Sequence, residues 1–190
     1  MNLFEFDIAR CLETLKAGRL ILYPTDTIWG IGCDATNEEA VKKVFAVKQR
    51  DASKSMIVLV ADINDIGNYA KPPSPEITSM IESSQRPLTI VFPGAKILAD
   101  DLIAEDGSIA IRVVKDDFCA ALIRAFGKPI VSTSANISGD PAPANFRAVS
   151  SEVSDAVDHI VQYRQDEESP SVASRIIKWT ETEELIVIRE

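Results

Sequence analysis

The sequence is poor in the residues on which disulfide, zinc and histidine chemistry depend. It has three cysteines, at positions 11, 33 and 119, and a single histidine, His159, among 190 residues. The cysteines are odd in number, widely spaced and without a C-x-x-C pair, so the sequence predicts neither a disulfide framework nor a zinc site. One histidine and no G-x-S-x-G segment argue against a Ser-His-Asp hydrolase, and we expect His159 to be structural.

Positive charge and long apolar runs are also scarce. Lys and Arg total 20 against 29 Asp and Glu, which gives a formal net charge of −9. This acidity argues against non-specific binding of nucleic acid, which depends on clustered cations that neutralise phosphates. The N-terminus lacks the basic and apolar regions of a secretion signal, and no apolar run approaches the roughly 20 residues that span a bilayer. We therefore expect a cytoplasmic protein with no membrane partner.

Apolar residues instead recur in short segments that alternate between helical and strand periodicity. The spacing predicts helices around residues 8–16, 37–45, 74–81, 116–126 and 149–157. It predicts strands at residues 20–23, 56–60, 88–92, 109–113, 130–131, 159–162, 175–179 and 185–189. The alternation indicates one α/β domain over residues 1–190. Its sheet should be mixed, because the last two strands are too close for a helical crossover.

Two polar segments could contribute to a ligand site, each with a structural alternative. Lys48 and Arg50, in K-Q-R after the second helix, would point the same way from an extended segment and could hold a polyphosphate. They would equally suit a solvated helix end whose charge complements the helix dipole. Thr27, in P-T-D-T-I-W-G after the first strand, would share a face with Thr25 and Trp29 if extended. An ordinary turn explains this segment as well.

A third polar segment, S-T-S-A-N-I-S-G at residues 132–139, also follows a strand, and open α/β sheets bind ligands at strand ends. Its alternate residues, Ser132, Ser134 and Asn136 among them, would form a wall of hydrogen-bonding side chains. Arg112 lies within an apolar strand, where it must pair with a carboxylate, bind a phosphate or reach water. A structural salt bridge and a ligand role are both open. The residues alone predict an α/β domain with a polar, cation-bearing cleft that suits a phosphorylated ligand.

Together these segments resemble one family. The P-T-D-T-x-W-G opening, the K-x-R pair, P-L-T at 87–89, A-I-R-V at 110–113 and S-T-S-A-N-x-S-G occur in the order and spacing of the YrdC/Sua5 family, the L-threonylcarbamoyladenylate synthases. The resemblance extends over about residues 12–189. It implies a twisted, open, mixed α/β sheet with flanking helices and a concave cleft. It also implies the single-domain YrdC type, without the second domain of the longer Sua5 members.

The resemblance implies an enzyme, a nucleotidyltransferase that joins L-threonine, bicarbonate and ATP into threonylcarbamoyl-AMP and releases pyrophosphate. Magnesium would be carried on the ATP phosphates, where it keeps several waters, rather than by metal ligands of the chain. The product would supply the N6-threonylcarbamoyl group of the adenosine next to the tRNA anticodon. Separate threonylcarbamoyl-transferase proteins would act downstream, so binding of tRNA itself would be indirect or weak.

Site roles follow from the same resemblance, position by position. Lys48 and Arg50 match the catalytic pair that holds the ATP phosphates. Asn136 and Arg189 match further positions on the ATP side. The positions that match the L-threonine side are Thr27, Arg112, Ser134 and Ser174. Leu59 stands where the longer members have histidine, so that contact is absent.

Two other functions remain open from the sequence. A non-catalytic RNA-binding module could use the same cleft, and it would bind tRNA tightly and salt-sensitively without making an adenylate. A carbamoyl-adenylate enzyme, of the kind fused into hydrogenase-maturation proteins, would use carbamoyl phosphate in place of threonine and bicarbonate.

Overall fold

The structure is a computed structural model that describes residues 2–49, 56–168 and 172–190. Its helices in these ranges are α1 (Leu3–Lys16), α2 (Glu38–Lys48), α3 (Ile66–Tyr69), α4 (Pro75–Ser83), α5 (Asp117–Phe126) and α6 (Ser151–Ser154). Its strands there are β1 (Ile21–Tyr23), β2 (Gly30–Gly32), β3 (Ile57–Val60), β4 (Leu88–Phe92), β5 (Ile109–Val113), β6 (Ile130–Ser134), β7 (His159–Ile160), β8 (Arg175–Trp179) and β9 (Leu185–Arg189).

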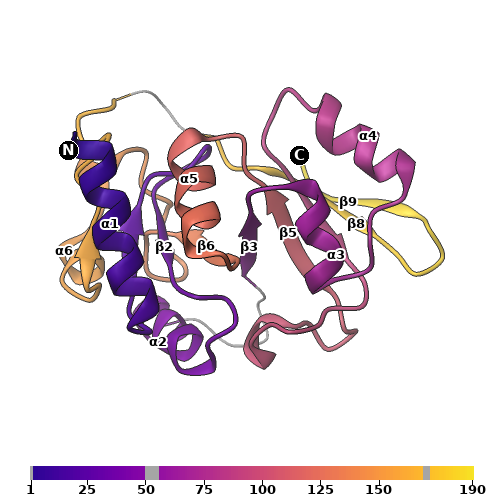
Figure 1. The fold of residues 1–190 in the computed structure, drawn as a ribbon, viewed down its shortest axis with the longest axis horizontal. Coiled ribbons are helices and arrows are strands. Elements are labelled where there is room, and N and C mark those ends of the chain that lie inside the picture. The colour runs from indigo at the N-terminus through magenta and orange to yellow at the C-terminus, as the bar shows by residue number, and fades with distance from the viewer. Residues whose placement is uncertain (1, 50–55, 169–171) are drawn as a thin grey trace.

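The strands form one sheet in the order β7-β1-β2-β6-β3-β5-β4-β8-β9. The pairs β1–β7, β3–β5 and β4–β8 are parallel, and the other neighbours are antiparallel. This confirms the mixed α/β sheet that the sequence predicts. Strands β8 and β9 form an antiparallel hairpin, drawn in yellow at the opposite end of the molecule from α1 (Figure 1).

Local capping sets most of the predicted helix boundaries. Asn37, Ser74 and Asp116 accept hydrogen bonds from backbone N–H groups in the first turns of α2, α4 and α5, which satisfies donors that have no partner within the helix. Gly127, with a φ of 74°, ends α5 in the left-handed conformation that favours glycine. These helices begin within a residue or two of where the sequence places them.

The helix expected over residues 149–157 is wrong, because only Ser151–Ser154 is helical. The segment beyond α6 has to leave the helix in order to join the sheet beside β1. The Asp158 carboxylate accepts from the Leu20 backbone N–H over 2.9 Å, and the N–H groups of Asp158 and His159 donate to the Leu20 carbonyl. Pairing with β1 therefore overrides the helical spacing of the valines.

Strand alternation divides the sheet into two faces. Val58, Ile111 and Val131 are fully or almost fully buried, and α1, α3 and α5 lie in front of the sheet in Figure 1. Successive residues of a strand point to opposite sides of the sheet. Arg112 therefore lies on the face opposite to that of Ile111. Ile57, which is in register with Ser132, lies on the same face as Arg112. That second face carries the candidate site.

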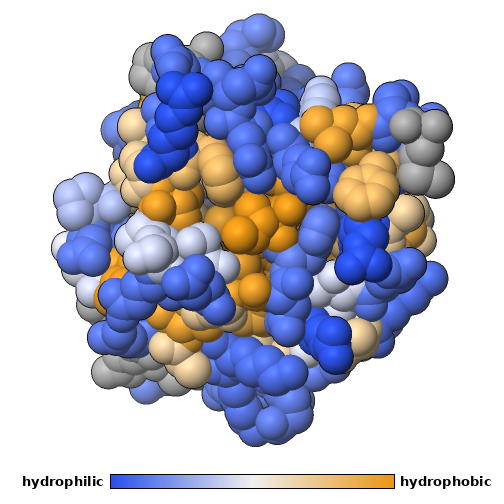
Figure 2. Space-filling model, turned by 90° about the vertical axis from the view of Figure 1, so that its left-hand side faces the viewer, coloured by the Kyte–Doolittle hydropathy of each residue, from blue (hydrophilic) through white to orange (hydrophobic). Residues whose placement is uncertain are grey.

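The end of the molecule that carries α1 is seen in Figure 2. Hydrophilic side chains cover most of its periphery and surround a central band of hydrophobic residues. Leu3 and Phe6 of α1 are exposed to 45% and 41%. Among the described residues, no helix combines the length and the apolar character that crossing a membrane requires.

Candidate functional site

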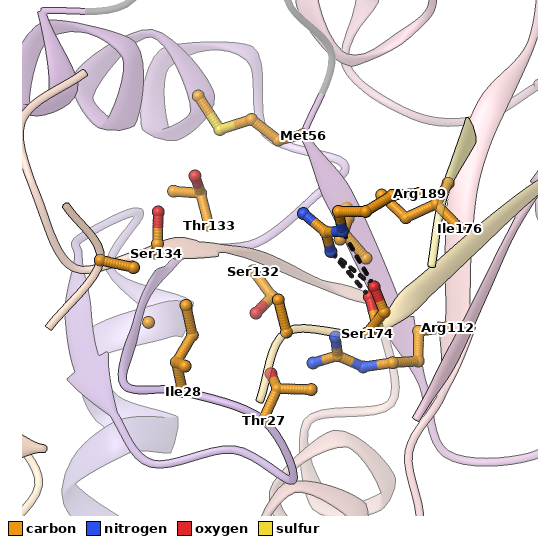
Figure 3. Close-up of a pocket in the computed structure, with 14 residues that line it drawn as sticks. Thr27, Ile28, Met56, Arg112, Ser132, Thr133, Ser134, Ser174, Ile176 and Arg189 are labelled. Atoms are coloured by element: carbon orange, nitrogen blue, oxygen red, sulfur yellow. Dashed lines mark hydrogen bonds between the residues drawn. The ribbon is translucent and has the colours of Figure 1, made fainter. Parts of the chain in front are cut away.

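A pocket of about 240 Å³ opens on the polar face of the sheet (Figure 3). It is built by the loop between β1 and β2, by strands β3, β5 and β6, and by the β8–β9 hairpin, which are far apart in the sequence. Its polar lining consists of Thr27, Arg112, Ser132, Thr133, Ser134, Ser174 and Arg189. The structure therefore brings together all four residues predicted for the threonine side, together with Arg189.

The loop between β1 and β2 holds Thr27 at the pocket through Thr25. The Thr25 hydroxyl donates to the Ile28 carbonyl oxygen over 2.8 Å and accepts from the Thr27 backbone N–H over 3.0 Å. The two threonine hydroxyl oxygens are 2.9 Å apart. Because the single hydroxyl proton of Thr25 goes to Ile28, Thr27 is the donor in this contact. The Thr27 oxygen keeps its lone pairs for a donor in the pocket.

Trp29 does not belong to the same surface as Thr27. Its ring packs on Phe146, with the ring centroids 4.8 Å apart, and it is 5% exposed. The hypothesis that Thr25, Thr27 and Trp29 form one wall is wrong, because the hydrogen bonds of Thr25 bend the loop, so that it is not extended.

Arg112 contributes buried hydrogen-bond donors. Its side chain is 3% exposed, and its Nη2 lies 3.1 Å from Oδ1 of Asp26. The two groups are not aligned for a hydrogen bond. Among the described residues, Nε and Nη2 of Arg112 have no hydrogen-bond acceptor. The guanidinium therefore makes a structural ion pair and also keeps two adjacent donors, which fit the two oxygens of a carboxylate.

Arg189 reaches the pocket from β9 and binds the main chain at Ser174. Its Nε and Nη2 donate to the Ser174 carbonyl oxygen over 3.0 and 2.8 Å, and Nη2 donates to Ser174 Oγ over 3.2 Å (Figure 3). Ser174 Oγ lies 2.8 Å from Oγ1 of Thr89 on β4. Burial, and secondarily the Arg112 cation, lower the pKa of Arg189. Two cations therefore converge at this corner, which suits an anionic group.

Lys48 lies behind the pocket wall and binds the turn that follows β6. Its side chain is buried, with the residue 1% exposed. Nζ donates to the carbonyl oxygens of Ser134 and Asn136 over 2.5 and 2.8 Å, and the side-chain oxygens of the same residues are 3.4 and 3.5 Å away. The alternative of a solvated helix end is therefore wrong for Lys48. Its ammonium holds Ser134 in place at the pocket.

The predicted wall of alternate residues ends at Ser134. Thr133 lines the pocket as well as Ser132 and Ser134, and the Asn136 backbone N–H bonds to the Ser134 carbonyl over 2.9 Å, so the chain turns there. The Asn136 amide donates to two carbonyls of its own loop, 2.9 and 2.7 Å away. Asn136 thus lies next to the pocket lining and not within it. Arg50, the other member of the K-x-R pair, lies outside the described residues.

Other pocket residues carry no signal in the sequence. Met56, Ile57 and Ile176 add an apolar wall, and only the register of distant strands brings them together. Leu59 is fully buried in register with Arg112. Gly30 does have a signal in the sequence, because it is the first glycine of the W-G-x-G motif. A Cβ at Gly30 would lie 3.1 Å from the Thr133 carbonyl oxygen, so a side chain there would crowd the close approach of β2 and β6.

Known proteins are similar to this chain in sequence over most of its length. The family model Sua5/YciO/YrdC, described as "Telomere recombination", matches residues 13–190. The threonylcarbamoyl-AMP synthase of Pseudoalteromonas translucida is 33% identical over 157 residues, which are 81% of this chain and 84% of that protein. The threonylcarbamoyl-AMP synthase of Stenotrophomonas maltophilia is 36% identical over 151 residues, 75% of this chain and 78% of that protein.

Solved structures give the same fold. P. abyssi Sua5 complexed with L-threonine has a TM-score of 0.85 at 26% identity. The match covers 97% of this chain and 54% of the Sua5 chain, so this chain spans about half the length of that protein. E. coli YciO has a TM-score of 0.80 at 21% identity, which supports the fold alone.

Proposed function

Since the chain belongs to the Sua5/YciO/YrdC family, we propose that it is a threonylcarbamoyl-AMP synthase, an enzyme that uses L-threonine, bicarbonate and ATP. The observation that carries the proposal is the buried Arg112 in the same pocket as Thr27. Two adjacent donors of Arg112 suit a carboxylate, and the acceptor oxygen of Thr27 suits an amine. These are the two groups that every free amino acid presents.

In this proposal the pocket binds the amino acid by its polar ends. Arg112 donates to the carboxylate, and the Thr27 oxygen accepts from the amine. The Ser134 and Ser174 hydroxyls lie on two other walls of the pocket, and they would bind the threonine hydroxyl and the carbamate oxygens. A ligand held at both ends has little freedom to turn, which lowers the entropic part of the barrier to the next step.

The reaction needs no nucleophile from the protein. The neutral threonine nitrogen attacks the carbon of bicarbonate and water leaves, or it attacks CO₂ and gives up a proton, and either route forms a carbamate. A carbamate oxygen then attacks the α-phosphorus of ATP, the bond from that phosphorus to the bridging oxygen breaks, and pyrophosphate leaves. The three cysteines agree with this scheme, because burial raises the pKa of each thiol and keeps it in the unreactive protonated form.

The nucleotide side of the proposal rests on cations. Arg189 lies in the pocket, and we assign Arg50 and Lys48 to the phosphates from the K-x-R pattern. Lys48 would also act indirectly, because it holds the Ser134 and Asn136 carbonyls. The described lining has hydroxyls but no carboxylate, so magnesium would enter with ATP as part of the substrate. Spreading the phosphate charge over these cations is the main catalytic demand of such a transfer.

The proposed product determines the partners. Threonylcarbamoyl-AMP is a reactive mixed anhydride, so separate transferase proteins would pass the threonylcarbamoyl group to tRNA. The enzyme itself would be a nucleotidyltransferase that works in the cytoplasm, where ATP and tRNA are available.

Release of pyrophosphate with and without L-threonine tests the proposal. We expect release to require threonine and bicarbonate together. Lys48→Ala and Arg50→Ala should each lower it on the order of 100-fold or more, whereas Arg164→Ala should not, because Arg164 pairs with Asp116 and Glu167 outside this pocket. Circular dichroism checks that the variants fold.

Three outcomes would contradict the synthase. ATP turnover that is the same without threonine excludes it. Turnover that needs carbamoyl phosphate instead would indicate a carbamoyl-adenylate enzyme. Tight, salt-sensitive binding of tRNA with no adenylate product would indicate an RNA-binding module.

A further inference from the structure

Thr89 is the one polar residue of strand β4. It is fully buried, and Leu88, Ile90 and Phe92 are buried in the same strand. It also ends the P-L-T segment of the sequence, to which the proposed reaction assigns no role. Burying a hydroxyl is unfavourable unless the hydroxyl makes a hydrogen bond, and valine has the same branched shape and suits a strand as well. The contact that the Thr89 hydroxyl makes therefore indicates why threonine is there.

The partner of Thr89 is Ser174, the residue directly before β8. Thr89 Oγ1 lies 2.8 Å from Ser174 Oγ, and Ser174 is 1% exposed. Among the described residues, this is the one side-chain hydrogen bond of Thr89. If Thr89 accepted from Ser174, its own proton would be buried without an acceptor, which is costly. Thr89 is therefore the donor in this contact.

Arg189 supplies a second donor to the same serine oxygen. Its Nη2 donates to Ser174 Oγ over 3.2 Å (Figure 3). A serine hydroxyl has two lone pairs and one proton, so donation from Thr89 and from Arg189 occupies both lone pairs. The Ser174 proton is then left without an acceptor among the described residues. Because Ser174 lines the pocket, its acceptor has to come from a ligand there.

We propose that Thr89 is a positioning residue, which fixes the Ser174 hydroxyl as a donor to an anionic oxygen of the ligand. The inference rests on the proposed function for the identity of that oxygen, which belongs either to the threonine carboxylate or to the carbamate. Both groups only accept hydrogen bonds, and the Arg112 and Arg189 cations line the same pocket. A ligand that offered a proton to Ser174 would meet another proton.

A measurement without ligand tests the direction of the hydrogen bond. Nuclear magnetic resonance of the full chain in mixtures of H₂O and D₂O measures the exchange of the Thr89 hydroxyl proton. We expect slow exchange in the wild type, because the proton is buried and has an acceptor. In Ser174→Ala the acceptor is lost, and exchange should become faster on the order of 10-fold. Equal exchange rates in the two proteins overturn the proposal, whatever reaction the protein catalyses.

Steady-state release of pyrophosphate tests the effect on the ligand. Thr89→Val removes the hydroxyl and keeps the branched shape, so it should lower kcat/KM for threonine on the order of 10-fold. Thr89→Ser restores a hydroxyl and should recover most of that loss. Ser174→Ala should also lower kcat/KM. Adding Thr89→Val to it should cost little more, because the group that Thr89 positions is then absent.

Binding of L-threonine alone, measured by calorimetry, identifies the oxygen that Ser174 binds. A weaker Kd in Thr89→Val indicates the carboxylate, since no carbamate forms without bicarbonate. An unchanged Kd together with a lower kcat indicates the carbamate. A variant with unchanged Kd, KM and kcat overturns the proposal, because Thr89 then serves only the packing of β4 on β8.

Thr14→Val is the matched control. Thr14 is 9% exposed, and its hydroxyl donates to the Arg10 carbonyl oxygen over 2.9 Å within α1. The variant therefore also loses a hydroxyl hydrogen bond, but outside the pocket lining, and pyrophosphate release should stay unchanged.

Two kinetic results would overturn the positioning role. One is a loss in Thr89→Ser as large as that in Thr89→Val, and the other is additive losses in the variant that combines Thr89→Val with Ser174→Ala. If Thr89→Val does not fold by circular dichroism, the exchange measurement on the wild type and Ser174→Ala decides. A wild type that releases no pyrophosphate with threonine contradicts the proposed function, whereas the exchange measurement still decides the hydrogen bond.

Discussion

At the scale of single residues, Asp26 determines how Arg112 is presented to the pocket. Asp26 does not line the pocket, yet its carboxylate is 3.1 Å from the Arg112 Nη2 and is 11% exposed. Burial raises the pKa of Asp26, and the Arg112 cation acts against that shift. The carboxylate therefore works as a positioning group, which holds the guanidinium by charge while leaving its donors for a ligand.

We expect Asp26→Asn to raise the KM for threonine on the order of 10-fold, since a neutral amide no longer orients the buried cation. The KM for ATP should change less. Steady-state pyrophosphate release at varied threonine measures this effect, and Asp155→Asn, at an exposed position, is the control. If Asp26→Asn lowers the thermal stability but leaves the threonine KM unchanged, Asp26 has only a structural role.

At the scale of elements, Asp7 joins α1 to the segment that follows β7. Asp7 is fully buried, and its Oδ2 accepts from the backbone N–H groups of Gln162 and Tyr163 over 2.9 and 2.8 Å. His159 Nε2 is 3.5 Å from Asp7 Oδ1, but neither atom makes a hydrogen bond within the described residues. Burial lowers the pKa of His159 from its ordinary value of 6.5; Asp7 opposes this shift and Arg10 adds to it.

This junction predicts a dependence of stability on pH. Because the folded state lowers the pKa of His159, the unfolded state binds the proton more readily. The contribution of neutral His159 to the free energy of unfolding is therefore complete above pH 6.5. It is lost as the pH falls through the lower pKa that His159 has in the folded protein. Urea unfolding at several pH values should show that the free energy of unfolding falls less at acid pH for His159→Gln than for the wild type. Identical losses in both proteins would contradict the prediction.

Elements also differ in how far the sequence predicts them. Helices α2, α4 and α5 follow from local signals, because their caps lie within three residues of the groups they satisfy. The sequence does not predict strand β2, because the three residues of G-I-G have little strand preference. It exists because β1 and β6 pair on either side of it. A Cβ at Gly32 would lie 2.6 Å from the Tyr23 ring, so glycine there serves packing.

At the scale of the whole molecule, the net charge and the pocket charge have opposite signs. The chain carries −9 overall, while Arg112 and Arg189 line the pocket and Lys48 lies behind it. An acidic exterior repels an extended polyanion, whereas a small anion can enter the pocket, where the charged side chains of the described lining are both cations. The molecule is therefore suited to a nucleotide and not to the backbone of a nucleic acid.

We accordingly expect this protein alone to bind tRNA weakly at physiological salt, with a Kd no tighter than about 10⁻⁶ M, as for non-specific binding. Fluorescence anisotropy with labelled tRNA over a series of salt concentrations measures the affinity and its salt slope. ATP binding under the same conditions serves as the positive control. A nanomolar Kd with a steep salt slope would contradict the expectation.

The sequence by itself determined the α/β class, the mixed sheet, the capped helices and the residues that resemble the family motifs, because caps and periodicity act over a few neighbouring residues. Only the tertiary structure decided what those residues touch. It buried Lys48 against the Ser134 and Asn136 carbonyls and set Arg112 beside Asp26. It also left β9 at an open edge. These contacts depend on the register between strands far apart in the chain, which no local pattern contains.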